Sequence, residues 1–62
     1  MELSKQDRVV IAVIRAMEEM GLTEIRTATE LGTTSIHIRG KRRDGVQIIA
    51  IVDTKGKTSY GT

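Results

Sequence analysis

The first third of the chain carries its apolar residues at helical spacing. One broad stripe with a period of 3.6 residues contains Leu3, Val10, Val13, Ile14, Met17 and Met20. The charged residues fall largely on the opposite side, as in an amphipathic helix. Ser4 is a suitable N-cap with Asp7 three residues later, and Gly21 offers a left-handed stop. The β-branched run at 9–14 would also suit a strand, but the cap, the length and the ending favour a helix over residues 4–20.

Beyond Gly21 the period of the pattern changes from 3.6 to two. Residues 23–31 alternate between apolar or threonine positions and charged or small ones, which is typical of a half-buried strand. The same reasoning predicts strands over 34–39, 46–53 and 57–60. Turns are expected at Gly32-Thr33, over residues 40–45 and at Lys55-Gly56.

The register of the two central hairpins follows from simple pairing. Leu31 opposite Thr34 puts Thr27 opposite Ile38, and we then expect Ile38 opposite Ile48. Both hairpins then turn their apolar residues to the same face, as one buried sheet surface requires. The pattern therefore predicts an α+β fold in which an N-terminal helix packs on a three- to four-stranded antiparallel β-meander. Residues 1–62 would form a single small domain.

A second fold stays open at this stage. Ala28, Gly32 and Ile38 have the spacing of a helix-turn-helix, and residues 46–60 would then form a wing. With that arrangement the chain would resemble a minimal winged helix-turn-helix DNA reader. The recognition helix would have to contain Gly40, and its apolar residues are two apart rather than three or four, so the meander is the preferred fold.

The composition limits how so short a chain is stabilised. There is no cysteine for disulfides or thiolate metal sites, and the single histidine, His37, cannot hold a metal alone. We expect no metal and no cofactor. A domain of this size buries a small core, so association into a homodimer is expected. The residues expected to form the interaction or dimer surface are the apolar ones left outside the core and the histidine beside them: Ile11, His37, Ile49 and Ile51.

Membrane and export signals are not visible in the pattern. The longest apolar runs fall far below the roughly 18 residues that a membrane-spanning helix needs. The start, "MELSKQD", is polar and has no basic segment leading into an apolar stretch. We therefore expect a cytoplasmic protein with no membrane partner.

The charge is unevenly distributed along the chain. Residues 1–38 carry four Lys/Arg against six Asp/Glu, a net −2, while residues 39–62 carry six against two, a net +4. Such asymmetry indicates a surface that faces a polyanion. The expected nucleic-acid-binding residues are the six cations of the second part: Arg39, Lys41, Arg42, Arg43, Lys55 and Lys57. Gly40 and Gly45 would let the loop over 40–45 approach phosphates closely.

The same basic loop has a plainer explanation. Its charges would keep two apolar flanking strands from aggregating, with no partner at all. Lone His37 has no nucleophile or paired carboxylate at a suggestive spacing, so no enzyme activity is expected.

Two functions lead, and an enzyme that uses His37 as its general base is the third alternative. The first is a small non-enzymatic nucleic-acid-binding or regulatory protein, which contacts the phosphate backbone of DNA or RNA through the basic hairpin loop. The alternative is a protein-interaction or inhibitor module, which binds a partner protein through the exposed isoleucine face or a sheet edge.

Overall fold

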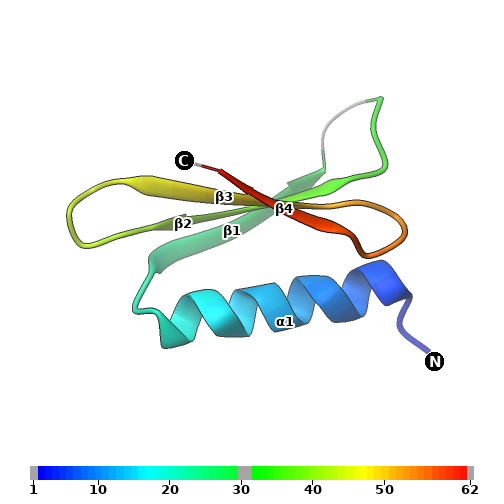
Figure 1. Cartoon of the computed structure of the whole chain (residues 1–62), viewed down its shortest axis with the longest axis horizontal. Coiled ribbons are helices and arrows are strands. Elements are labelled where there is room, and N and C mark those ends of the chain that lie inside the picture. The colour runs from blue at the N-terminus through cyan, green and yellow to red at the C-terminus, as the bar shows by residue number, and fades with distance from the viewer. Residues whose placement is uncertain (1, 30–31, 62) are drawn as a thin grey trace.

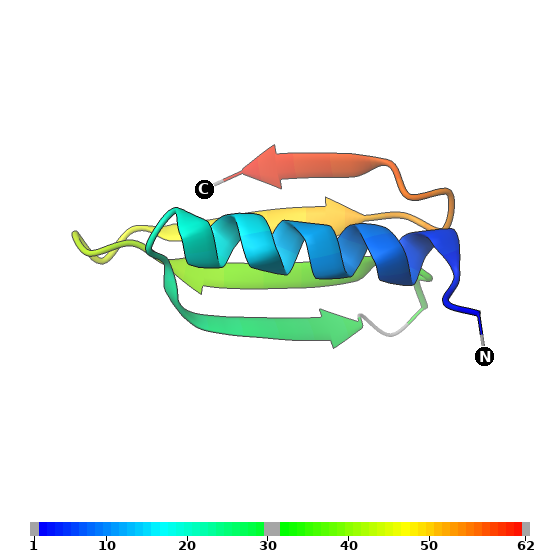
Figure 2. The same cartoon turned by 90° about the horizontal axis from the view of Figure 1, so that it is seen from below.

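One helix and a four-stranded antiparallel sheet make up the fold (Figure 1). The computed structural model describes residues 2–29 and 32–61. Its elements are α1 (Lys5–Glu19), β1 (Thr23–Thr29), β2 (Ile36–Lys41), β3 (Gln47–Val52) and β4 (Thr58–Gly61), and the strand order is β1-β2-β3-β4. The sheet is open, and α1 lies along one of its faces (Figures 1 and 2). The predicted α+β fold is confirmed. The helix-turn-helix alternative is wrong, because both of its helices would fall on strands.

The helix ends where the sequence signals predict. At the start, the Ser4 hydroxyl accepts a hydrogen bond from the Asp7 N–H at 3.0 Å. At the end, Gly21 has a φ of 82°, and the Leu22 N–H donates to the Met17 carbonyl at 3.0 Å. This glycine-based stop reverses the chain within two residues. It also turns Leu22 into the core beside Met17.

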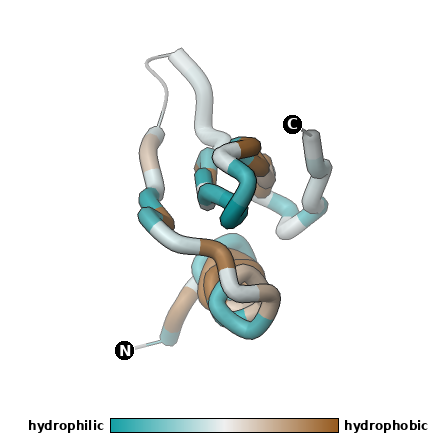
Figure 3. Tube along the Cα trace, turned by 90° about the vertical axis from the view of Figure 1, so that its left-hand side faces the viewer, coloured by the Kyte–Doolittle hydropathy of each residue, from teal (hydrophilic) through white to brown (hydrophobic). Residues whose placement is uncertain are grey.

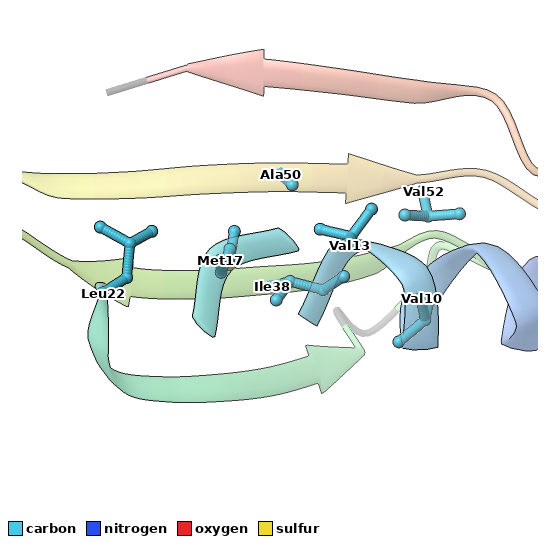
Figure 4. Packing of buried hydrophobic residues seen from close by; sticks show 7 residues of the cluster. All are labelled: Val10, Val13, Met17, Leu22, Ile38, Ala50 and Val52. Carbon is cyan, nitrogen blue, oxygen red and sulfur yellow. The ribbon is translucent and has the colours of Figure 1, made fainter. Parts of the chain in front are cut away.

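The core lies between α1 and the two central strands. Its buried residues come from one side of the helix, from the connection between α1 and β1, and from alternate positions of β2 and β3: Val10, Val13, Met17, Leu22, Ile38, Ala50 and Val52 (Figure 4). Leu3 and Met20 belong to the predicted stripe but are 50% and 65% exposed. Both lie at the ends of the helix, outside the turns that pack on the sheet. The apolar surface that stabilises the fold is therefore short and central.

The first hairpin has the predicted register, and the second differs from it. Thr27 pairs with Ile38 as expected, whereas Ile38 pairs with Ala50 and not with Ile48. The ladder continues to Lys41 opposite Gln47, so the turn is shorter than expected. A slip of two residues keeps every side chain on its face, which is why the apolar pattern could not reveal it. Glu30 and Leu31, the expected end of the first strand and part of its pairing, lie outside the described residues.

β1 contains an irregularity near its start. Thr23 pairs with Lys41 and Arg26 with Arg39, so two residues of β1 stand opposite one residue of β2. Within this bulge Glu24 has a φ of 52°, a left-handed conformation that is uncommon for residues other than glycine. Such a bulge disturbs an edge strand and hinders its pairing with a further strand. The strict alternation expected from residue 23 onward thus begins only after the bulge.

Candidate nucleic-acid interface

The face of the sheet opposite α1 carries a pair of arginines directly across two strands. Arg26 of β1 is paired with Arg39 of β2, and the side chains of both are exposed. In the part of the chain that the structure describes, neither arginine forms an ion pair. Like charges directly opposite each other on one sheet face destabilise the fold. An arginine pair that the fold itself does not neutralise is a natural contact for an anion.

The β2–β3 turn extends this positive surface to one end of the molecule. The Arg42 N–H donates to the Val46 carbonyl at 2.9 Å, and the Gly45 N–H donates to the Arg42 carbonyl at 3.0 Å. Gly45 has a φ of 89°, as in a three-residue hairpin loop with glycine at its last position. Every residue from 41 to 47 is exposed. Figure 3, which looks at the molecule from this end, shows the turn as a hydrophilic segment in front of the sheet.

Two acidic side chains neutralise part of the charge here. Arg42 forms an ion pair with Asp44 at 2.8 Å, and Lys41 lies 4.0 Å from the Glu24 carboxylate. Asp44 also accepts a hydrogen bond from the Val46 N–H at 3.1 Å. All four charged side chains are at least half exposed, so these pairs are weak and exchange readily with other partners. Arg43 has no ion pair among the described residues.

Gly40 does not have the role that the sequence suggested. It lies within β2, is buried, and is paired with Ile48. A Cβ atom at this position would lie 3.1 Å from Leu22 Cδ1 and 3.4 Å from Met17 Sδ. The interpretation of Gly40 as an approach point for phosphate is therefore wrong, because Leu22 and Met17 cover it. Its small size instead lets the end of the helix close over the base of the hairpin.

The six predicted cations do not form one surface. Arg39, Lys41, Arg42 and Arg43 follow one another along β2 and its turn, whereas Lys55 and Lys57 lie in the β3–β4 turn at the other end of the sheet (Figures 1 and 2). The molecule is 36 Å long, so the two turns cannot contact the same phosphate. We name the four cations of β2 and its turn, with Arg26 added, the basic surface: Arg26, Arg39, Lys41, Arg42 and Arg43.

The four predicted interaction residues are also divided. His37, Ile49 and Ile51 share the open face, where His37 pairs with Ile51 and Arg39 pairs with Ile49. Ile11 lies on α1, which packs on the other face. Ile51 is 38% exposed and Ile49 is half-buried. The two isoleucines line a shallow hollow with residues of β4. The apolar and the basic positions are thus neighbours on one face rather than separate surfaces.

Arg26 is the residue of this surface that the sequence reasoning missed. The signal was available, because Thr27 opposite Ile38 requires Arg26 opposite Arg39 in any antiparallel pair. Gln47 was missed as well. It lies opposite Lys41 on the open face, one position after the turn.

Comparison with known proteins adds no family to this description. The chain matches no protein-family model, and neither curated proteins nor solved structures give a significant match.

Within residues 2–29 and 32–61, no cluster of three His, Cys, Asp or Glu side chains could hold a metal ion. The described helix is too short and too polar to cross a membrane. The functional argument therefore depends on the geometry of the surface itself.

Proposed function

We propose that this chain is a small, non-enzymatic nucleic-acid-binding protein with a regulatory role. The basic surface contacts the phosphate backbone, and charge neutralisation supplies most of the affinity. The proposal includes the cytoplasmic location that the sequence predicts. The observation that carries it is the Arg26–Arg39 pair on the face that α1 leaves uncovered. The basic turn follows Arg39 along the chain.

Electrostatics favour an anionic partner over other partners for this face. The basic surface holds five positive charges, against which Glu24 and Asp44 supply two negative ones. Binding a polyanion relieves the repulsion between the two arginines and releases counterions from the partner. Phosphate contacts of this kind fix position on the backbone and do not read sequence. We therefore expect an affinity that depends steeply on salt.

The test is a fluorescence-anisotropy titration with labelled DNA and RNA oligonucleotides at several salt concentrations. Removing both arginines, in Arg26→Ala/Arg39→Ala, should lower the slope of log affinity against log salt by about 2. The matched control is Arg8→Ala/Arg15→Ala, which removes two exposed arginines from α1 on the other side of the molecule. It should change the affinity by less than about twofold. Absence of binding to all oligonucleotides at low salt would refute the proposal.

A homodimer is part of the proposal, and the charge distribution restricts its geometry. Stacking two copies through their open faces would bring the arginine pairs against each other, which like charges disfavour. Pairing along the β4 edge, which lacks the bulge of β1, avoids this contact and would present two basic surfaces to one nucleic acid. Light scattering coupled to size-exclusion chromatography measures the mass directly. A monomer at concentrations well above those used for binding would remove the dimer from the proposal.

A second candidate function is supported by the hollow beside β4. Ile49 and Ile51 line it together with Ser59, Tyr60 and Gly61. The small residues Ser59 and Gly61 stand opposite the two isoleucines and leave them accessible. An apolar side chain of a partner protein would fit there. Such binding would be lost in Ile51→Ser and would respond weakly to salt. Nucleic-acid binding should instead survive Ile51→Ser, so this variant separates the two functions.

A further inference from the structure

The two edges of the sheet differ in how they are protected against further pairing. β1, at one edge, has its bulge at Glu24 and carries the charged side chains of Glu24 and Arg26. Bulges and charges of this kind keep an edge strand from adding another strand. β4, at the other edge, pairs with β3 without a bulge, and its residues, Thr58–Gly61, include neither a charge nor a proline. The β4 edge is therefore open to a further strand.

The groups that β4 offers at this edge follow from the alternation of hydrogen bonds in an antiparallel ladder. The Asp53 N–H donates to the Lys57 carbonyl at 3.0 Å, which makes these two residues a hydrogen-bonded pair. Because such pairs alternate with pairs that are not hydrogen-bonded, every second residue from Lys57 onward bonds to β3. The N–H and C=O groups of Thr58 and Tyr60 then point away from β3. Within the part of the chain that the structure describes, β3 is the one strand that pairs with β4.

The helix leaves room beside this edge. Figure 2 shows α1 lying across β2 and β3, with β4 beyond its border. Tyr60 pairs with the buried Ala50, so its side chain lies on the face that α1 covers, yet it remains 67% exposed. It is the only aromatic residue of the chain. An exposed tyrosine beside backbone groups that no strand pairs is typical of an interface with another protein chain.

We propose that the β4 edge pairs with the β4 edge of a second copy of this chain, antiparallel and across a two-fold axis that passes between the two Ser59 residues. This inference rests on the homodimer of the proposed function and specifies its interface and register. Thr58 of one copy and Tyr60 of the other form a hydrogen-bonded pair, and the axis repeats it, which gives four backbone hydrogen bonds. A shift of two residues in either direction would leave one of the outward positions without a partner in the described strand.

A second copy fits this edge better than an unrelated strand does. Two-fold symmetry places the same donors and acceptors opposite each other, so every outward group of the described strand is paired. The side chains are also compatible, because Lys57 lies opposite Gly61 of the other copy and no like charges meet. Tyr60 and Thr58 of the other copy then stand side by side on the face that carries the helices.

The interface joins the two open faces into one. Residues directly opposite each other in a sheet point to the same face, so the two four-stranded sheets form one eight-stranded sheet with both basic surfaces on one side. Three strand spacings separate each Arg26–Arg39 pair from the axis, which puts the two pairs about 29 Å apart along a flat sheet with strands about 4.8 Å apart. One polyanion can contact both copies at once, and its affinity rises through two linked contacts.

Cysteine substitution tests the register directly, because the chain contains no native cysteine. In the proposed register the two Ser59 residues form a pair without hydrogen bonds, with Cα atoms about 4.5 Å apart, which a disulfide can span. Ser59→Cys should therefore form an intermolecular disulfide under mild oxidation. One control is Ala28→Cys, an exposed position of the same face on β1. The other is Thr58→Cys, whose two Cα atoms would lie about 8 Å apart, beyond the reach of a disulfide.

The rates of cross-linking decide between registers and interfaces. Ser59→Cys should form the disulfide at least about tenfold faster than either control, since only its two sulfur atoms meet without movement of the backbone. Cross-linking of Ser59→Cys at the rate of Ala28→Cys, or faster cross-linking of Thr58→Cys, would overturn the inference. Failure of the cross-link in a protein that still binds nucleic acid would leave the proposed function standing. Absence of nucleic-acid binding in a protein that cross-links would refute the function and leave the interface standing.

Thr58→Pro provides a second test that leaves the sheet intact. It removes one outward N–H and none of the bonds between β3 and β4, so the circular-dichroism spectrum should match that of the native protein. Light scattering at concentrations from about 10 μM to about 1 mM should show the native mass rising to that of a dimer and the variant remaining a monomer. The variant should also bind at least about tenfold more weakly to an oligonucleotide that spans both basic surfaces. A folded Thr58→Pro variant that dimerises like the native protein would overturn the inference.

Discussion

The turn between β2 and β3 and the turn between β3 and β4 have the same backbone geometry. In the first, the Arg42 N–H donates to the Val46 carbonyl at 2.9 Å, and in the second the Asp53 N–H donates to the Lys57 carbonyl at 3.0 Å. Each has its glycine in the left-handed conformation, with φ of 89° and 84°. Each also carries two cations at or next to the loop. The backbone and the charge therefore do not distinguish the two turns.

Their surroundings do distinguish them. A Cβ atom on Gly56 would lie 3.1 Å from Val9 Cγ2 and 3.2 Å from Lys5 Cγ, whereas nothing lies within 4 Å of the same atom on Gly45. The β3–β4 turn thus packs on the start of α1, and the β2–β3 turn extends into solvent (Figure 1). A turn that packs on the helix serves the fold. A turn that extends freely is available to a partner.

The aspartates of the two turns also differ in the groups that they contact. Asp53 accepts hydrogen bonds from the N–H groups of Lys55 and Lys57, at 2.9 and 2.8 Å. Asp44 accepts one backbone hydrogen bond and pairs with the Arg42 guanidinium. One carboxylate stabilises its own turn, and the other restrains a side chain of the basic surface.

The largest expected effect is on the free energy of unfolding, and it distinguishes Gly56 from Gly45. Gly56→Ala should reduce the free energy of unfolding by about 2–3 kcal/mol, because a left-handed alanine is strained and its methyl group would crowd Val9 and Lys5. Gly45→Ala has the strain without the crowding and should cost about 1 kcal/mol. Urea unfolding followed by circular dichroism measures both. Equal losses would mean that the packing of the β3–β4 turn contributes nothing to stability.

Asp53→Ala should have the next largest effect, since it leaves two backbone N–H groups without their acceptor. We expect a loss of about 1–2 kcal/mol in the free energy of unfolding. Asp44→Ala removes one such bond and should cost about 0.5 kcal/mol. Because it also frees Arg42 and removes a negative charge, it should strengthen nucleic-acid binding, whereas Asp53→Ala should not. If Asp44→Ala and Asp53→Ala bound nucleic acid equally well, the claim that only the β2–β3 turn contacts the partner would be contradicted.

The smallest expected effect concerns Glu24, which lies 4.0 Å from Lys41. Glu24→Gln removes a negative charge from the basic surface and should raise the affinity for duplex DNA about two- to threefold at low salt. The gain should vanish at high salt, where exposed charges are screened. Stability should change little, because exposed ion pairs contribute little. Unchanged affinity at low salt would show that Glu24 lies outside the bound surface.

Much of the fold could be predicted from the sequence, because the alternation of apolar residues specifies which face each strand buries. The shift of two residues between β2 and β3 could not, since it leaves every face unchanged. The bulge at Glu24 was hidden for another reason: glutamate is not a residue that marks a left-handed position. Local signals such as Ser4 and Gly21 were reliable because capping depends on neighbouring residues alone.

Some features of the candidate site could likewise be predicted from the sequence, and others could not. Consecutive turns of a meander lie at opposite ends of the sheet, so the separation of Lys55 and Lys57 from Arg42 and Arg43 follows from topology alone. The Arg26–Arg39 pair follows from the register of the first hairpin. The Arg42–Asp44 ion pair could not be predicted, because it depends on the conformations of two exposed side chains. Neither could the burial of Gly40, which depends on where Leu22 enters the core.

The central claim is that nucleic acid binds specifically to the β2–β3 turn and the open face. Other exposed clusters of positive charge on the molecule should not bind it. The most direct measurement compares Arg42→Ala/Arg43→Ala with Lys55→Ala/Lys57→Ala in titrations with one duplex DNA at several salt concentrations. Both variants remove two charges from turns of equal backbone geometry. Loss of the two arginines should weaken binding at least about tenfold and lower the salt slope by about 2, while loss of the two lysines should change the affinity by less than about twofold. Equal losses in the two variants would contradict the claim.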